Sequence, residues 1–155
     1  MERDYKKALD KINPLVKKFP NHPFFIFLKA ESLVKLHQWD DYDDIRPLLL
    51  KLSEHKSTII ANECKLKLKY LVALYAFNHN DIDYSIILCT EIIDLYDMEF
   101  NWLLGLSYMQ RALSYIAIKD IENAKHDLQL ISNMDSKYPE IKESQELLHL
   151  LSNAR

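Results

Sequence analysis

Hydrophobic residues recur at intervals of three and four along most of the chain, which is the spacing of side chains on one face of an α-helix. The pattern is clearest in residues 108–128, where Tyr108, Ala112 and Tyr115 fall on one side of a first helix. Ala124 begins the matching side of a second helix, after a short polar connection. Two apolar faces joined so closely can be buried only against each other, which predicts a helical hairpin.

The same spacing predicts about eight helices over the whole chain. Residues 64–70 also alternate like a half-buried strand, but no turn residue bounds them, and Leu68 and Leu71 carry the helical spacing onward. We therefore expect a helix there, and Asp81 or Asp83 is expected to cap the next one. The expected helices cover residues 3–19, 24–36, 43–52, 57–79, a segment ending at Leu95, 100–118, 121–134 and 140–151, with residues 38–41 as a connection.

Short motifs recur along the chain as well. Residues 45–48 (IRPL) repeat the pattern of residues 12–15 (INPL), 33 residues earlier. A repeat at this distance is typical of arrays of helical hairpins.

Residues 108–128 resemble a tetratricopeptide repeat (TPR), a hairpin of about 34 residues. The pattern of that family is Trp-x2-Leu-Gly-x2-Tyr in the first helix, then Ala-x3-Phe and a late Pro in the second. The chain keeps the offsets of both helices with Tyr108, Arg111, Ala112, Tyr115, Ala124 and Leu128. Tyr, Arg, Ala and Leu replace the family's Trp, Leu, Gly and Phe, and Pro139 lies three residues beyond the place of the family's proline.

Other parts of the chain resemble the family more loosely. The opening segment matches a second helix at Tyr5, Ala8, Ile12, Leu15 and Pro20. In the second helices of the middle repeats, Asp41 or Tyr42, and then Ser85, stand where the family has a small residue. In the first helices, the position where the family has a small residue is occupied by Ala30, Ala73 and Ala112. These alanines are 43 and 39 residues apart.

This resemblance implies an all-α fold: a right-handed superhelical stack of antiparallel helix hairpins, or α-solenoid, with a C-terminal capping helix. We expect a single domain over residues 1–155. Residues 1–20 would be the second helix of a truncated repeat, residues 23–54, 57–97 and 100–136 the hairpins, and residues 138–153 the capping helix. A generic helical-repeat solenoid stays open as an alternative.

Composition narrows the class of function. The only glycine is Gly105, while phosphate-binding loops and dinucleotide sites each need glycine. A net charge of −3 gives no reason to expect nucleic acid as a partner. The six histidines show no metal-ligand spacing, and the aspartates of residues 40–44 lack the glycine turn and distal Glu of a calcium loop. We expect no enzyme activity, no cofactor and no metal site.

The two cysteines, Cys64 and Cys89, lie in apolar helical segments, which favours buried, reduced thiols. The chain has no signal-peptide pattern and no apolar stretch of the roughly 18 residues that a membrane span needs. We therefore expect a cytoplasmic protein that does not bind a membrane.

In a TPR-like stack, the first helices of the hairpins line a concave groove. Here the register places an apolar and aromatic set in that groove, which would suit a partner helix or an extended apolar peptide. Several of these side chains are equally well explained as core residues or as covered by the last helix. The expected groove residues are Phe24, Phe27, Glu31, Lys67, Tyr70, Leu74, Phe77, Leu106, Met109 and Leu113.

Some TPR proteins hold a C-terminal carboxylate with a Lys/Asn/Arg clamp, but Leu28, Leu71 and Leu106 stand at the clamp positions here. The sequence therefore predicts a non-catalytic interaction module or scaffold that binds another kind of protein or peptide partner. The alternative is a peptide-sensing or regulatory domain of a larger protein. The sequence predicts neither the partner nor the oligomeric state.

Overall fold

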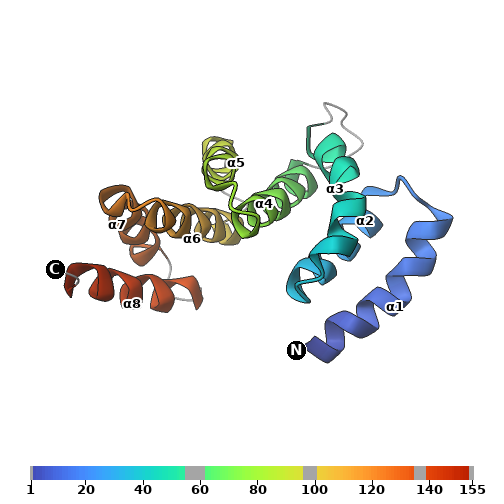
Figure 1. Cartoon of the computed structure of the whole chain (residues 1–155), viewed down its shortest axis with the longest axis horizontal. Helices are drawn as coiled ribbons and strands as arrows, with labels where there is room; N and C mark the ends of the chain where they lie inside the picture. Colours follow the sequence, from blue (N-terminus) through green and yellow to red (C-terminus); the bar gives the residue numbers. More distant parts are fainter. Residues whose placement is uncertain (1, 55–61, 96–100, 135–138, 154–155) are drawn as a thin grey trace. The chain divides into compact units, whose positions relative to one another are not determined.

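The computed structural model describes residues 2–54, 62–95, 101–134 and 139–153. These residues form eight helices and no strand, which confirms the all-α class (Figure 1). The helices are α1 (Glu2–Lys18), α2 (Pro23–Lys35), α3 (Trp39–Glu54), α4 (Asn62–Asn78), α5 (Ile82–Asp94), α6 (Asn101–Ala117), α7 (Ile121–Ser132) and α8 (Pro139–Asn153). Among the described residues, no helix is both long and apolar enough to cross a membrane.

One expected boundary is wrong. Residues 38–41 were expected to be a connection, but α3 begins at Trp39, and the Tyr42 N–H already donates to the Gln38 carbonyl. The acidic side chains of Asp40 and Asp41 occupy the first turn of α3, where the positive end of the helix dipole favours them. The start of the expected fourth helix, at residues 57–61, lies outside the described residues.

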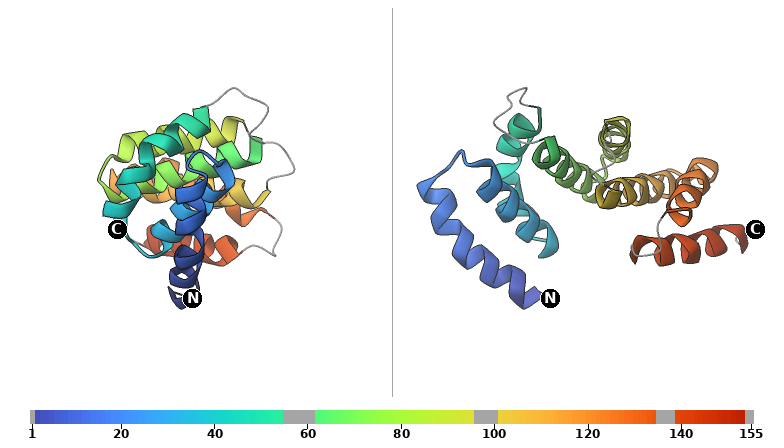
Figure 2. Two further views of the ribbon diagram at one scale, coloured as in Figure 1. Left: turned by 90° about the vertical axis from the view of Figure 1, so that its right-hand side faces the viewer. Right: turned by 180° about the vertical axis from the view of Figure 1, so that it is seen from behind.

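The chain forms two compact units, Met1–Tyr75 and Ala76–Arg155. In the first unit, α1 packs on α2 and α2 packs on α3 (Figures 1 and 2). In the second unit, α5 packs on α6, α6 on α7 and α7 on α8, and α8 also contacts α6. All of these contacts except that of α8 with α6 join helices that follow each other in the sequence.

The turns that follow α2, α4 and α6 share one hydrogen-bond pattern. Each has one residue of positive φ, which is 53° for His37, 62° for Asn80 and 64° for Lys119. The N–H of that residue donates to the carbonyl three positions earlier, and the next N–H donates to the carbonyl five positions earlier. This is the Schellman motif, which satisfies the last carbonyls of a helix.

These turns repeat at separations of 43 and 39 residues, which are also the separations of Ala30, Ala73 and Ala112. All three alanines are fully buried. Five residues beyond each turn lies another fully buried side chain, namely Tyr42, Ser85 or Ala124. The structure therefore selects Tyr42, rather than Asp41, as the residue at the small position of α3.

Equivalent positions also make equivalent contacts in the two units. In the first unit, the ring of Tyr75 on α4 stacks on the ring of Tyr42 on α3, with the centroids 5.1 Å apart. In the second unit, the Ser114 hydroxyl on α6 donates to the Ser85 hydroxyl on α5 at 3.3 Å. Tyr75 and Ser114 each lie two residues after a buried alanine. The same pair of positions therefore joins α3 to α4 in the first unit and α5 to α6 in the second.

Candidate functional site

The expected groove residues lie on α2, α4 and α6, the three helices that end in Schellman turns. They occupy matching positions when α2, α4 and α6 are aligned on their buried alanines. Helix α2 carries Phe24, Phe27 and Glu31; α4 carries Lys67, Tyr70, Leu74 and Phe77; and α6 carries Leu106, Met109 and Leu113.

In the first unit, these side chains retain solvent-accessible surface. Phe24 is 55% exposed, while Phe27 and Glu31 on the same helix are half-buried. On α4, Lys67 and Tyr70 are half-buried as well, and so is Leu74. The Lys67 ammonium lies 5.8 Å from the centroid of the Phe27 ring, within the range of a cation–π contact, so the structure brings α2 and α4 together at this point.

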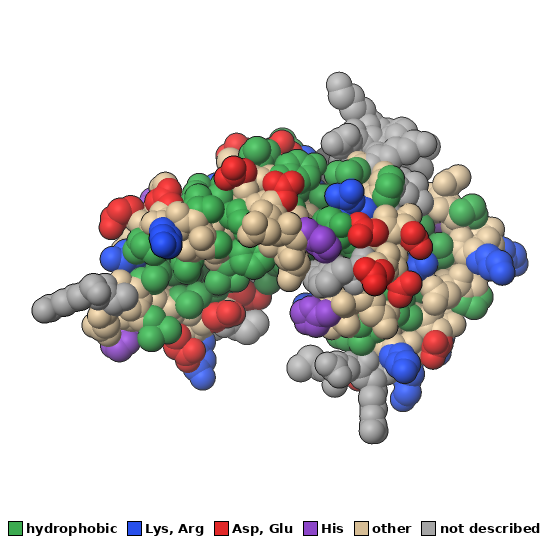
Figure 3. Space-filling view, viewed as in Figure 1, with side chains coloured by type: hydrophobic (Ala, Val, Ile, Leu, Met, Phe, Trp, Pro, Cys, Tyr) green, Lys and Arg blue, Asp and Glu red, His purple; other side chains and the backbone are tan. Residues whose placement is uncertain are grey.

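In the second unit, the structure places two of the predicted residues in or against the core. Met109 is only 6% exposed and belongs to a buried cluster with Leu128 and Ile131 of α7. Leu113 packs against the same cluster, as do Leu147, Leu148 and Leu151 of α8. Hydrophobic side chains gather over α6 and α8 on the face shown in Figure 3. Met109 therefore has little surface left for a partner.

The two remaining groove residues of the second unit are half-buried. Leu106 lies one turn before Met109 on α6. Phe77 lies in the last turn of α4, where its carbonyl accepts the N–H of Asn80. Contact of these residues with a partner stays a prediction.

A polar cluster that the sequence pattern did not reveal joins α5, α6 and α7. The Arg111 guanidinium donates from Nε and Nη2 to the two carboxylate oxygens of Asp127, each at 2.8 Å, and from Nη1 to the Thr90 hydroxyl at 3.0 Å. The rings of Tyr108 and Tyr115 lie 5.4 Å and 6.0 Å from the guanidinium carbon. Two features of the sequence pointed to this cluster. Arg111 stands where the TPR pattern has an apolar leucine, and Asp127 directly precedes Leu128, which lies on the apolar side of α7.

The cluster keeps Arg111 charged. Burial by itself lowers the pKa of Arg111, but the hydrogen bonds and negative charge of Asp127 outweigh that effect, so the pKa lies above its ordinary value. Cys89 on α5 is fully buried next to this cluster, and burial raises the pKa of its thiol to about 12. It is a free cysteine, as predicted, and the scarcity of its thiolate at neutral pH makes it unsuited to be a nucleophile. The side chain of Cys64 lies outside the described residues.

A second polar cluster surrounds the stacked tyrosines of the first unit. The Tyr75 hydroxyl donates to the Asp43 carboxylate, and the Arg46 guanidinium carbon lies 4.8 Å from the centroid of the Tyr75 ring. Burial raises the pKa of Tyr42 well above its ordinary value, and the positive charge of Arg46 opposes that shift only in part. These groups hold α3 against α4.

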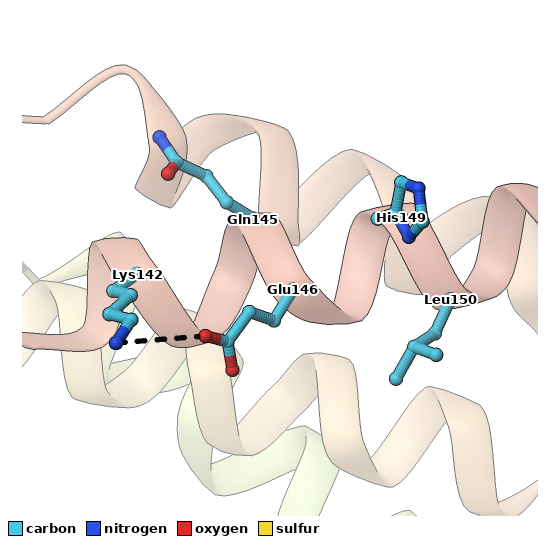
Figure 4. A pocket seen from close by; sticks show the side chains of 5 residues that line it. All are labelled: Lys142, Gln145, Glu146, His149 and Leu150. Carbon is cyan, nitrogen blue, oxygen red and sulfur yellow. Dashed lines mark ion pairs between the residues drawn. The ribbon is translucent and has the colours of Figure 1, made fainter.

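Open hollows lie on the described surface. One of about 520 Å³ runs along α8, where Lys142, Glu146 and Leu150 point to one side, while Gln145 and His149 lie along the other edge (Figure 4). Lys142 Nζ lies 3.9 Å from Glu146 Oε1, and both side chains are largely exposed. Within the described residues, no group of three His, Cys, Asp or Glu side chains could hold a metal ion.

Comparison with known proteins adds no assignment, because no protein-family model, no curated protein and no solved structure matches the chain.

Proposed function

We propose that the protein is a non-catalytic interaction module, a TPR-like scaffold that binds a peptide or partner helix through its expected groove residues. The observation that carries the proposal is the common register of α2, α4 and α6. Each ends in the same turn and has the same buried alanine, and equivalent contacts join α3 to α4 and α5 to α6. Repeated hairpins of this kind typically stack and present one side of their first helices as a binding surface.

The part of this face in the first unit has suitable chemistry for a peptide. Phe27, Tyr70 and Leu74 are half-buried and keep some apolar surface in contact with solvent, and Lys67 and Glu31 supply one charge of each sign beside them. Aromatic anchors bordered by charged groups are typical of surfaces that bind an amphipathic helix or an extended segment. The proposed location is the cytoplasm, which the free, buried thiol of Cys89 would suit.

The experiment begins with partners captured by the immobilised chain and identified by mass spectrometry. The identified partner is then titrated by calorimetry against the wild type and against the Phe27→Ala, Tyr70→Ala and Lys67→Glu variants. We expect each aromatic truncation to weaken binding by about tenfold or more. Leu95→Ala is the matched control, because Leu95 is a large apolar side chain that is 64% exposed and lies outside the groove.

Thermal melting of each variant separates loss of contact from loss of folding. The Lys67→Glu variant changes a half-buried surface charge. It therefore still tests the groove if either aromatic variant has a lowered melting temperature. Binding that is indifferent to all three groove variants would remove the groove from the proposal.

A further inference from the structure

Aromatic rings gather where α1 turns into α2, around Phe25. The Phe19 ring centroid lies 6.1 Å from that of Phe25, and the Phe24 centroid lies 6.2 Å from it on the same helix. His22, in the turn, stacks on Phe25 at 4.3 Å. Phe25 is half-buried, and the three rings around it are exposed. We name this set, together with Leu15, Lys17 and Lys18, the α1–α2 corner.

The corner exposes more apolar surface than folding of the first unit requires. Phe24 is 55% exposed, Phe19 is 44% exposed and Leu15, one turn before Phe19, is 38% exposed. Apolar side chains exposed singly are ordinary on protein surfaces, but adjoining ones commonly mark an interaction site. Phenylalanine in particular is enriched at the centres of protein interfaces.

The corner is also positively charged within an acidic protein. Residues 11–30 contain four lysines and no Asp or Glu, while the whole chain has a net charge of −3. Lys17 and Lys18 form the last turn of α1, and the Lys18 ammonium lies 5.4 Å from the centroid of the Phe19 ring. Hydrophobic and basic side chains lie next to each other at the end of the first unit that α1 and α2 form (Figure 3).

The start of α2 adds to this positive field. His22 is the N-cap residue, but its side chain makes no capping hydrogen bond, and the first turn of α2 has no acidic residue. Carboxylates are the groups that usually stabilise this end of a helix. The corner therefore combines exposed rings with positive charge, and residues 11–30 contain no acidic side chain.

We propose that the α1–α2 corner is a docking site for an acidic segment of a partner protein, one in which Asp or Glu residues flank large apolar side chains. The apolar side chains would pack on Phe19, Phe24 and Phe25, and the carboxylates would pair with Lys17 and Lys18. An anionic membrane fits less well. Residues 36–155 contain 19 acidic and 12 basic residues, so most of the chain would be repelled by such a surface, whereas a short acidic segment meets only the corner.

This site is separate from the proposed groove, which shares only Phe24 with it. The test therefore uses Phe19, Lys17 and Lys18, none of which belongs to the groove. The probe is a fluorescein-labelled synthetic peptide in which Glu and Asp alternate with Leu and Phe, and fluorescence anisotropy measures its binding to the full chain. A second peptide with Lys in place of every acidic residue has the same apolar content.

We expect the acidic peptide to bind, the basic peptide not to bind, and the affinity to fall as sodium chloride is added. The double variant Lys17→Glu/Lys18→Glu should weaken binding by about tenfold or more, because each reversed charge turns an attraction into a repulsion. Phe19→Ala should weaken it by about tenfold. The matched controls are Lys6→Glu/Lys7→Glu near the start of α1, and Leu95→Ala.

Several outcomes would overturn the proposal. Equal binding of the two peptides would show that charge does not select the partner, and equal losses in the matched control variants would show that the corner does not bind it. Binding to phosphatidylserine vesicles in place of the peptide, lost in the Lys17→Glu/Lys18→Glu variant, would assign the corner to a membrane. Concentration-dependent self-association abolished by Phe19→Ala would assign it to a second copy of the chain. Tyr70→Ala should leave binding of the acidic peptide unchanged. The corner proposal can therefore be overturned without affecting the proposal for the groove.

Discussion

At the scale of single residues, Arg111 shows how a charge is accommodated between packed helices. Asp127 is 1% exposed, and moving an isolated carboxylate into such a place would cost several kcal/mol. The two parallel hydrogen bonds from Arg111 compensate that cost, and the Thr90 hydroxyl accepts a third hydrogen bond from the guanidinium. The pair therefore stabilises the fold only while both members are present.

Removing one member should destabilise the second unit strongly. In Arg111→Met the carboxylate of Asp127 stays buried without its partner, and we expect the free energy of unfolding to fall by about 3–5 kcal/mol. The double variant Arg111→Met/Asp127→Leu removes both charges and should be close to the wild type. Urea unfolding followed by circular dichroism measures both changes.

The exposed pair Lys142–Glu146 is the matched control for this prediction. Its side chains are 85% and 66% exposed, so Lys142→Met should change stability by less than about 1 kcal/mol. Equal midpoints for Arg111→Met and Lys142→Met would contradict the assignment of Arg111 to a buried ion pair.

The residue scale also shows where sequence reasoning works and where it stops. Ala112 and Ala124 were recognisable because small residues at fixed offsets let two helices approach closely, and both are fully buried. Asp127 was not recognised, because a hydrophobic pattern treats an aspartate as a surface residue, although it is buried here by its contact with Arg111. The same limitation concealed the packing of Tyr75 and Asp43 beside the buried Tyr42.

At the scale of elements, the turns were the least visible part of the repeat. A Schellman turn usually has glycine at its positive-φ position, and this chain uses His37, Asn80 and Lys119 there. Because the turns have no glycine, the only sign of this repeat in the sequence was the spacing of Ala30, Ala73 and Ala112. The hydrogen bonds of the turns show that these separations relate equivalent positions of α2, α4 and α6.

The cost of a non-glycine residue in such a turn can be measured at Lys119. A side chain in the left-handed region costs about 1 kcal/mol relative to glycine. Lys119→Gly should therefore raise the free energy of unfolding by up to about 1 kcal/mol. The control is Lys125→Gly, inside α7, which should lower it by about 1 kcal/mol because glycine weakens a helix interior. Thermal unfolding resolves the two signs, and a destabilising Lys119→Gly would contradict the turn geometry.

Helix packing also limited the prediction of the groove. On α2 and α4 this position holds Phe27 and Tyr70, which are only half-buried, whereas on α6 it holds Met109, which is buried against α7. The difference arises because α8 packs on both α6 and α7. Sequence offsets give the direction of a side chain on its helix, but they do not show which later helix will cover it.

At the scale of the whole molecule, charge is distributed unevenly along the chain. Residues 1–35 contain eight basic and four acidic residues, and the remainder contains 12 basic and 19 acidic residues. The overall net charge of −3 conceals this division, so the net charge by itself indicated only that nucleic acid is not an expected partner. The division becomes informative once the exposed rings of Phe19 and Phe24 are placed beside the lysines of α1.

The two units also each bury a group that must stay neutral, which makes the whole protein sensitive to alkali. Burial raises the pKa of Tyr42 in the first unit, and it raises the pKa of Cys89 in the second unit to about 12. In the unfolded chain these groups titrate near their ordinary values, about 10 for tyrosine and about 8.5 for cysteine. As the pH rises above those values, the unfolded state loses protons that the folded state retains, so the free energy of unfolding must fall.

We expect that fall to begin near pH 9 and to reach at most about 1.4 kcal/mol per pH unit for each group. Urea unfolding at a series of pH values measures it. The double variant Tyr42→Phe/Cys89→Ala lacks both titrating groups and should show a flatter decline, although Tyr108, whose pKa burial also raises, keeps it from vanishing. Because Tyr42 and Cys89 lie in different units, each single variant should remove its own part of the decline. A double variant as sensitive to alkali as the wild type would mean that neither group is as deeply buried in solution as the structure places it.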